Sequence, residues 1–151
     1  MPKIIEHIEI AAPTTTVFRA CHDVNRPKWD VRMKRFKLIT STPIRQGTLF
    51  QADATAPSGA IFGWEGEFAE LKYPSNAVLR VLDAAPSSPF KSGTETWRFD
   101  TTGKTTKVTL TWEYQSRNVI ARILDWIGGR AVTRRAIRLG LANLKKMIES
   151  D

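Results

Sequence analysis

The feature that most restricts the fold of this chain is a change of apolar periodicity in its last third. From Gly93 the sequence runs GTETWRFDTTGKTTKVTLTWEYQSRN, in which apolar and polar residues alternate on both sides of a TTGKTT turn. A period of two is typical of half-buried strands, so we expect a hairpin with strands at 94–101 and 106–114. From 119 to 148 the period becomes that of a helix. A long hairpin followed by a long helix indicates a curved sheet that grips the helix.

The preceding sequence supplies the rest of the predicted sheet. Residues 3–11 alternate as a strand, Pro13 precedes a short amphipathic helix at 15–21, and a second helical turn is expected at 29–33. The further predicted strands are 36–40, 47–54, 60–71 and 77–84, with a turn at Ser41-Thr42-Pro43. Short turns between consecutive strands indicate antiparallel pairing. The predicted fold is α+β, with a curved antiparallel sheet of about seven strands and two short helices wrapped around a long C-terminal helix, in one domain over 1–151.

Two pairs of glycines interrupt these patterns. Gly63 and Gly66 lie inside the predicted strand 60–71, where glycine often marks a bulge or a sharp bend. Gly128 and Gly129 lie inside the C-terminal helix and cost about 2 kcal/mol relative to alanines. We therefore expect curvature in the strand and a kink or a break in the helix.

The C-terminal helix carries an apolar stripe on each side of its glycines. Both stripes are expected to press on the sheet, Ile120, Ile123, Leu124 and Ile127 before the glycines and Ile137, Leu141, Leu144 and Ile148 after them. With an unchanged helical phase, Arg130 and Arg134 would fall on the buried stripe. Either the glycines shift the phase, or these arginines reach a polar group or the mouth of a cavity.

Composition limits the class of protein. Of the 151 residues, 42% are hydrophobic and 25% are charged, which is typical of a globular protein. No apolar stretch approaches the ~18 residues that span a bilayer, and the first residues do not resemble a secretory signal. Cys21 is the only cysteine, so no internal disulfide is possible, and the sequence predicts a reducing, cytoplasmic location.

The chain is strongly basic, with a net charge of +8, and its positive charge gathers in two clusters. These are Arg26, Lys28, Arg32, Lys34, Arg35 and Lys37, and then Arg117, Arg122, Arg130, Arg134, Arg135, Arg138, Lys145 and Lys146. The favoured interpretation of both is a solvated surface. The alternative is contact with an anionic membrane surface or a protein, while nucleic acid is disfavoured because no recognised binding motif accompanies the charge.

Several short motifs follow one another in an order shared with one known superfamily. They are Ile8-Glu9-Ile10-Ala11-Ala12-Pro13 leading into Val17-Phe18, Asp23 with Trp29-Asp30, Arg45-Gln46-Gly47-Thr48, the 93–114 hairpin, and Gly129-Arg130 with Leu144-Lys145. Their order resembles the START-like (SRPBCC, helix-grip) superfamily, closest to its polyketide cyclase/dehydrase and lipid-transport branch. The resemblance implies a deep pocket between sheet and helix for a lipid, sterol, polyketide, plant hormone or quinone.

Alternate residues of a strand point to opposite faces of the sheet. This strand parity selects the side chains that would face such a pocket. The candidate ligand-binding residues are Phe62, Trp64, Phe68, Leu79, Val81, Trp97, Phe99, Leu110, Trp112 and Tyr114 from the strands and Ile137 and Leu141 from the helix. This set is large, aromatic and apolar, which suits a flat or greasy ligand. The alternative is that the same side chains simply fill the core.

Catalytic candidates are few. His7 and His22 are expected at the surface or at a helix end, Cys21 as a buried thiol, and Glu65, Glu67, Arg80 and Arg98 as exposed charges. Glu6 shares a face with apolar residues and is left open, either at a frayed strand end or facing the cavity. Tyr114 and Trp97 could donate hydrogen bonds to a ligand. No metal-ligand spacing occurs, and no catalytic residue, metal or cofactor is assigned.

The sequence thus predicts a protein that binds a hydrophobic small molecule as a carrier or sensor. One alternative is a polyketide cyclase or dehydratase, which requires a polar pair in the pocket, such as Glu6 or Tyr114 with an arginine. The other is an accessory factor that contacts a membrane or a protein through its basic faces.

Overall fold

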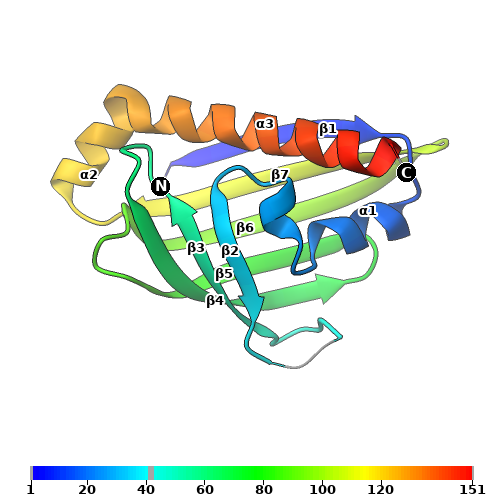
Figure 1. Cartoon of the computed structure of the whole chain (residues 1–151), viewed down its shortest axis with the longest axis horizontal. Coiled ribbons are helices and arrows are strands. Elements are labelled where there is room, and N and C mark those ends of the chain that lie inside the picture. The colour runs from blue at the N-terminus through cyan, green and yellow to red at the C-terminus, as the bar shows by residue number, and fades with distance from the viewer. Residues whose placement is uncertain (1, 41–42, 151) are drawn as a thin grey trace.

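Seven strands form one antiparallel sheet, and the helices lie on one of its faces (Figure 1). The computed structural model describes residues 2–40 and 43–150, so Ser41 and Thr42 of the predicted turn lie outside the described residues. The strands are β1 (Lys3–Ile10), β2 (Met33–Leu38), β3 (Leu49–Thr55), β4 (Ile61–Lys72), β5 (Asn76–Ala84), β6 (Phe90–Thr102) and β7 (Thr105–Ser116). The helices are α1 (Thr14–Cys21), the 3₁₀ turn η1 (Arg26–Lys28), α2 (Val119–Leu124), the π turn η2 (Asp125–Gly129) and α3 (Arg130–Glu149).

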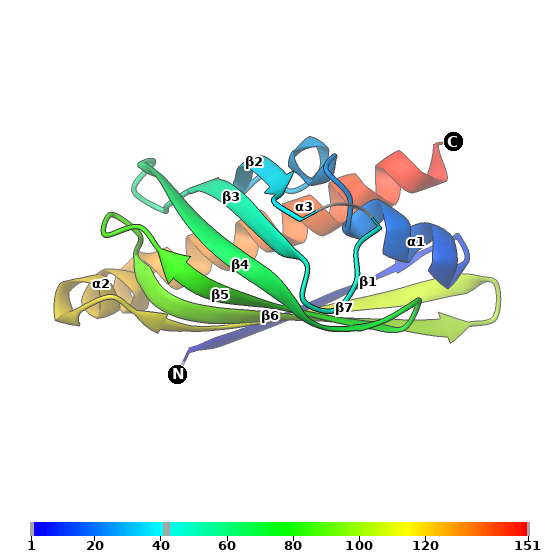
Figure 2. The ribbon, with the colours of Figure 1, turned by 90° about the horizontal axis from the view of Figure 1, so that it is seen from below.

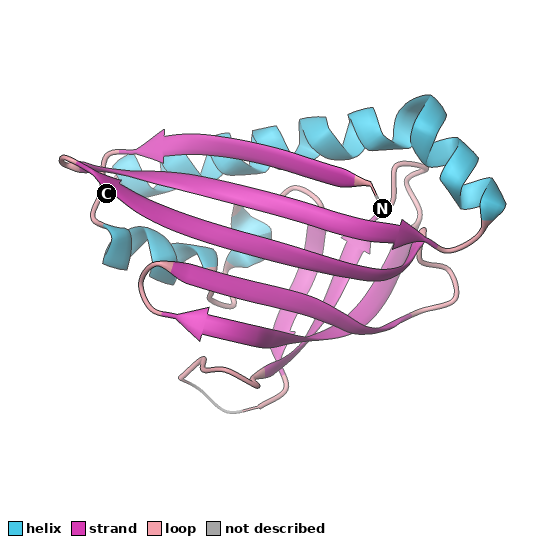
Figure 3. Cartoon of the chain, turned by 180° about the vertical axis from the view of Figure 1, so that it is seen from behind, coloured by secondary structure: helices cyan, strands magenta, loops and turns pink. Residues whose placement is uncertain are grey.

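The order of strands across the sheet is β1-β7-β6-β5-β4-β3-β2, which confirms the predicted α+β fold. Seen from behind, the strands cross the field in front of the helices (Figure 3). The predicted hairpin is present, and both of its strands extend beyond the expected bounds. The second helical turn, predicted at 29–33, is wrong. Pro27 fixes an earlier 3₁₀ turn, and Met33 already begins β2.

The predicted irregularity of β4 is present beside Gly66, whereas Gly63 pairs in regular register with Asp53 of β3. The β4–β5 pairing shifts register between Glu65 and Gly66 and again between Phe68 and Glu70. A Cβ at Gly66 would overlap the Phe50 ring and lie 2.8 Å from the Arg80 carbonyl oxygen. Only glycine allows this close approach of neighbouring strands, and the extra residues of the bulges increase the local twist.

The C-terminal helix changes direction near its glycines (Figure 1). Gly128 and Gly129 end the π turn η2, so the predicted irregularity is confirmed as a widened turn within a continuous helical path. Arg130 binds Asp125 at 3.1 Å and Arg134 reaches Glu6 at 3.7 Å. Both arginines therefore reach polar groups, which is one of the two predicted outcomes. Beyond them, the predicted stripe of α3 is buried, namely Ile137, Leu141, Leu144 and Ile148.

The expectation for the first stripe of this helix is wrong. Neither α2 nor η2 contains a buried residue, and Ile120, Ile123, Leu124 and Ile127 are exposed. The physical reason is their position, because the helix bends at η2 and α2 extends past the end of the sheet (Figures 1 and 3).

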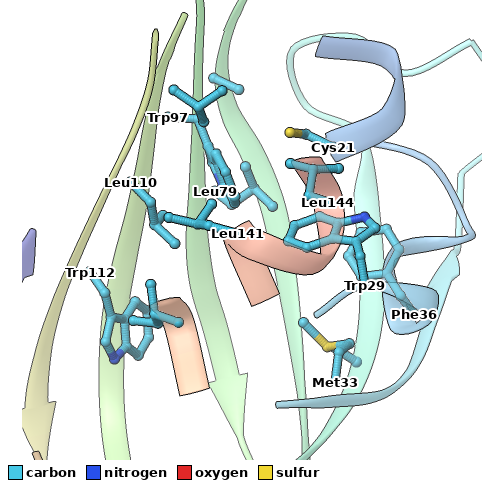
Figure 4. Packing of buried hydrophobic residues seen from close by; sticks show 14 of the residues in the cluster. Cys21, Trp29, Met33, Phe36, Leu79, Trp97, Leu110, Trp112, Leu141 and Leu144 are labelled. Carbon is cyan, nitrogen blue, oxygen red and sulfur yellow. The ribbon is translucent and has the colours of Figure 1, made fainter. Parts of the chain in front are cut away.

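The core fills the half of the concave face that α1 and α3 cover. Trp97, Leu110 and Leu79 point from the sheet towards Leu141 and Leu144 of α3 (Figure 4). Trp29 joins this core through an edge contact with Trp97, at a centroid distance of 5.9 Å. Cys21 is fully buried among them, and burial raises the pKa of its thiol. The predicted buried thiol is confirmed.

His22 ends α1, which is one of its two predicted positions, but it does not lie at the surface. Its ring is buried, with edge contacts to the rings of Phe18, Phe68 and Trp97 at centroid distances of 4.8, 5.8 and 5.6 Å. Among the described residues, neither ring nitrogen has a hydrogen-bond partner. Burial, reinforced by the charge of Arg26, lowers the pKa of His22 to about 3. The last turn of α1 presses this residue onto the sheet, whereas His7 is exposed as predicted.

His22 should make the protein sensitive to mild acid. Its folded pKa lies below its unfolded value, so its contribution to stability is present above pH 6.5 and is lost as the pH falls towards 3. Between pH 7 and 5 the wild type should lose about 2 kcal/mol of unfolding free energy more than a His22→Leu variant. Urea titrations at both pH values measure this. The exposed His7→Leu control should follow the wild type, and an equal loss in all three proteins would contradict the assignment.

Candidate ligand-binding cavity

A cavity of about 760 Å³ separates the other half of the concave face from the C-terminal helix. Its walls come from β3 to β7 and from the α2, η2 and N-terminal α3 segment. This segment and the β3–β4 and β5–β6 loops lie at the end of the molecule opposite α1 (Figures 1 and 2). The cavity exists because the side chains of α1 and of the later turns of α3 fill only the opposite half.

Half of the predicted site residues lie in the cavity wall, and the others pack in the core. Those in the wall are Phe62, Trp64, Leu79, Val81, Trp112 and Tyr114. Those outside the wall, all buried, are Phe68, Trp97, Phe99, Leu110, Ile137 and Leu141. Strand parity selects the inward face correctly but does not show which part of that face the helices cover. The role of these residues in ligand binding stays a prediction.

Aromatic rings form most of one wall. Phe62 stacks on Trp64 with centroids 5.6 Å apart, and Trp112 stacks on Tyr114 at the same separation. Phe90 meets Trp112 edge to face at 5.2 Å and joins the two pairs. The six-membered ring of Trp112 lies directly over Gly93, where any Cβ would overlap it. The result is a continuous, rigid aromatic surface.

A buried ionic group closes the inner end of the cavity. Arg26 is only 2% exposed, and its Nη2 donates to Glu95 Oε2 at 2.9 Å, while its Nε donates to Asp30 Oδ2 at 3.0 Å. Arg32 donates to both carboxylates, with Nη2 3.1 Å from Asp30 Oδ2 and 3.4 Å from Glu95 Oε2. The Trp97 indole N–H adds a third donor to Glu95, at 2.6 Å from Oε1. Arg26, Arg32 and Glu95 all border the cavity.

Mutual pairing keeps this group charged. Burial alone would raise the pKa of Asp30, but the charges and hydrogen bonds of Arg32 and Arg26 lower it to about 2. Burial likewise lowers the pKa of Arg26, yet Glu95 and Asp30 outweigh this effect and raise it above its usual range. Two arginines and two carboxylates balance in charge, which permits ions to exist against an apolar cavity.

The sequence interpretation did not identify this group. The predicted solvated basic surface is wrong for Arg26 and Arg32, because Arg26 is buried and the Arg32 side chain is mostly covered. One signal could have indicated it. Glu95 shares strand parity with Trp97 and Phe99, so it is a charged residue on an inward face and requires a buried partner.

A second polar group lies where β7 meets the helix. The Tyr114 hydroxyl donates to Asp125 at 2.7 Å, and Arg130 binds the same carboxylate at 3.1 Å. Burial, then the hydrogen bond and charge of Asp125, raise the pKa of Tyr114, so the phenol keeps its proton. The sequence predicts Tyr114 as a donor to a ligand, but here it fastens the sheet to η2.

Of the remaining charged candidates, Arg80 borders the cavity, and Glu6, Glu65, Glu67 and Arg98 lie outside its wall. Glu6 is buried beneath α3 and forms ion pairs with Arg138 and Arg134, so it is neither frayed nor facing the cavity. Glu65, Arg80 and Arg98 are exposed as expected, whereas Glu67 is half-buried and pairs with Arg80. The described residues contain no group of His, Cys, Asp and Glu side chains suited to a metal ion.

The cavity opens towards α2. Most of its exposed wall residues gather there, namely Pro57, Ser58, Pro86, Ser87, Asn118, Ile120 and Leu124. Arg117 holds the β5–β6 side of the opening, since its guanidinium donates to the carbonyl oxygens of Ala84, Ala85 and Ser88 at 3.0 to 3.2 Å. The opening is therefore framed by two loops and one short helix.

Comparison with known proteins agrees with this architecture. The model of the polyketide cyclase/dehydrase and lipid transport family matches residues 1–149. The chain belongs to this family. Membership implies a hydrophobic ligand, and it accounts for the helix-grip fold in which the cavity lies. A search of curated proteins gave no match.

Solved structures share the fold at low sequence identity. TTHA0849 from Thermus thermophilus superposes with a TM-score of 0.82 at 19% identity, covering 99% of this chain and 98% of that chain. The Zhui aromatase/cyclase from Streptomyces sp. R1128 gives 0.80 at 17% identity, with 98% and 93% covered. The major latex-like protein 151 of Panax ginseng gives 0.72 at 14% identity, with 97% and 96% covered.

Removing Arg26 should destabilise the fold severely. An Arg26→Met variant leaves Asp30 and Glu95 buried with one cation between them, and it should lose about 3–5 kcal/mol of unfolding free energy. The matched control is Arg80→Met, which breaks the partly exposed pair with Glu67 and should cost at most about 1 kcal/mol. Urea denaturation at pH 7 measures both. Equal losses would show that the Arg26 group does not stabilise the fold.

Proposed function

We propose that this protein binds a hydrophobic small molecule bearing an oxygen acceptor, and that it acts as a carrier or sensor in one domain over 1–151. The observation that carries the proposal is the cavity, whose wall is mostly aromatic and aliphatic, with a buried ionic group at its inner end and polar residues near its opening. A volume of about 760 Å³ falls within the usual range for sites that enclose a small organic ligand.

The wall favours a flat or extended apolar ligand. The stacked pairs Phe62–Trp64 and Trp112–Tyr114 expose ring surface, and Leu79 and Val81 continue the apolar lining along β5. The burial of apolar surface contributes about 25 cal/mol to the binding free energy for each Å² removed from water. A ligand that covers this wall gains affinity without any specific polar contact.

The ionic end supports a polar group on one end of the ligand. Within the described part of the chain, the hydrogen bonds of Arg26 and Arg32 use Nε and Nη2, and neither Nη1 is engaged. A guanidinium group with a spare donor binds a carbonyl, carboxylate or phenolate oxygen well. We therefore place the polar end of the ligand at Arg26 and Arg32 and its apolar part along the aromatic wall.

The second candidate function is cyclase or dehydratase catalysis, which the family description includes. A specific observation favours it, since Glu95 and the two arginines form a polar group at the cavity surface. Binding remains the primary proposal because every carboxylate oxygen of Glu95 already accepts from an arginine or from Trp97. A carboxylate held this way is a poor general base.

Filling the cavity should abolish binding. In a Val81→Trp variant the indole occupies the apolar part of the cavity, so the affinity for the fluorescent probe ANS should fall at least tenfold. The control is Leu82→Trp at the adjacent, exposed position, which should bind as the wild type does. Fluorescence titration measures both, with circular dichroism to verify folding. Similar affinities in the two variants would contradict the cavity as the site, and chemical conversion of a bound polyketide would favour the enzyme.

Arg32 should discriminate between ligands with and without an oxygen group. An Arg32→Leu variant should bind 1-pyrenebutyrate about tenfold or more weakly, since hydrogen bonds to charged groups contribute about 1.5–3 kcal/mol. Its affinity for pyrene, which lacks the carboxylate, should not change. Pyrene fluorescence reports both equilibria in one assay. A parallel loss for the two probes would mean that Arg32 maintains the cavity and does not contact the ligand.

A further inference from the structure

We propose that α2 and η2 form a docking surface for an anionic lipid bilayer, through which the hydrophobic ligand enters and leaves the cavity. This inference rests on the proposed binding function and names the partner that supplies the ligand. The surface, called the α2 patch below, consists of Val119, Ile120, Ile123, Leu124, Trp126 and Ile127.

The α2 patch is a dense group of exposed apolar side chains. Trp126 is 77% exposed, Ile120 70% and Ile127 65%, and no residue of α2 or η2 is buried. A globular domain rarely exposes a contiguous apolar surface of this kind without a partner that covers it. Exposed tryptophan adds a specific indication, since its amphipathic ring prefers the interface between lipid and water.

The patch forms one face of its helix. At about 100° per residue, its four members in α2 fall on a single continuous side, with Arg122 at the border, and Trp126 and Ile127 follow in the π turn η2. Asp125 faces the protein, where it accepts from Tyr114 and Arg130. A short helix with an apolar side, a basic border and no exposed acid has the character of an interfacial helix.

The patch is continuous with the mouth of the cavity. Ile120 and Leu124 belong both to the patch and to the cavity wall. Across the opening, the side chain of Pro57 lies close to Gly129 at the end of η2, where an added Cβ would be 3.6 Å from its Cγ. Insertion of the patch into a bilayer would therefore place the opening against the acyl chains. An apolar ligand could move between them without crossing water.

The charge around the patch selects an anionic surface. Residues 119–135 contain four arginines and one acid, a balance of +3 within a chain of net charge +8. In the described part of the chain, Arg122 and Arg135 form no salt bridge, and both are exposed. Basic side chains near a membrane surface are attracted by about 1 kcal/mol each when the lipids are anionic.

The same charge disfavours a second copy as the partner. A symmetric dimer across the patch would place Arg122 and Arg135 of each copy near those of the other, with no free carboxylate in residues 119–135 to compensate them. No helix in the described parts of the chain is long and apolar enough to cross a bilayer. Attachment at the surface is therefore the mode of contact that the geometry supports.

Vesicle flotation tests the proposal. The wild type should float with vesicles of phosphatidylcholine containing about a third phosphatidylglycerol and should not float with pure phosphatidylcholine. On binding, the emission of the exposed Trp126 should shift to the blue. The triple variant Ile123→Ser, Trp126→Ser and Ile127→Ser should bind vesicles at least tenfold more weakly. These positions lie outside the cavity wall, so its affinity for ANS should match the wild type.

The control replaces exposed apolar residues elsewhere, Ile5→Ser with Leu139→Ser, and it should retain vesicle binding. Arg122→Glu should weaken binding to anionic vesicles about tenfold. Two outcomes would overturn docking while leaving the ligand proposal intact. One is normal ANS binding without flotation of the wild type. The other is a concentration-dependent dimer in sedimentation that the triple variant abolishes. Failure of the wild type to bind ANS would instead overturn the proposed function itself.

Discussion

The constraint on which the rest of the structure depends is the buried ionic group that joins Arg26 and Arg32 to Glu95. Arg26 and Arg32 both lie just before β2, at one edge of the sheet, whereas Glu95 lies on β6, four places away in the strand order. A flat sheet would hold these charges far apart. Their pairing therefore requires the sheet to curl back over its own concave face, and the bulges beside Gly66 make that curl possible.

The curl of the sheet leaves a concave face whose two halves are filled differently. Side chains of α1 and of the later turns of α3 fill one half, so residues such as Trp97 and Leu141 become core. In the other half the C-terminal helix widens at η2 and turns away, and the cavity remains. The ionic group stands at the boundary. It supplies buried charges to a mostly apolar site, and the exposed helix α2 stands at the opposite end of the same site.

Most of the fold could be predicted from the sequence because its signals are local. The alternation of apolar and polar residues predicted the hairpin, and the helical spacing of apolar residues predicted the buried stripe of α3. Gly66 marked the bulge in β4, and Gly128-Gly129 marked the irregular turn of the C-terminal helix. The candidate site was predictable only in part. Parity placed Val81 and Phe68 on the same face of the sheet, but only Val81 lines the cavity. His22 and Arg26 looked solvated, since local pattern does not show that a distant strand will cover a polar residue.

The sequence by itself determined the elements, the inward faces, the basic charge and the resemblance to a family with a pocket, because each depends on residues close together in the chain. The tertiary structure alone decided three further points. They are which inward residues border the cavity, that Glu95 meets Arg26 and Arg32, and that the apolar stripe of α2 stays exposed. Each depends on contacts between segments far apart in sequence, and the curl of the sheet and the bend of the helix set those contacts.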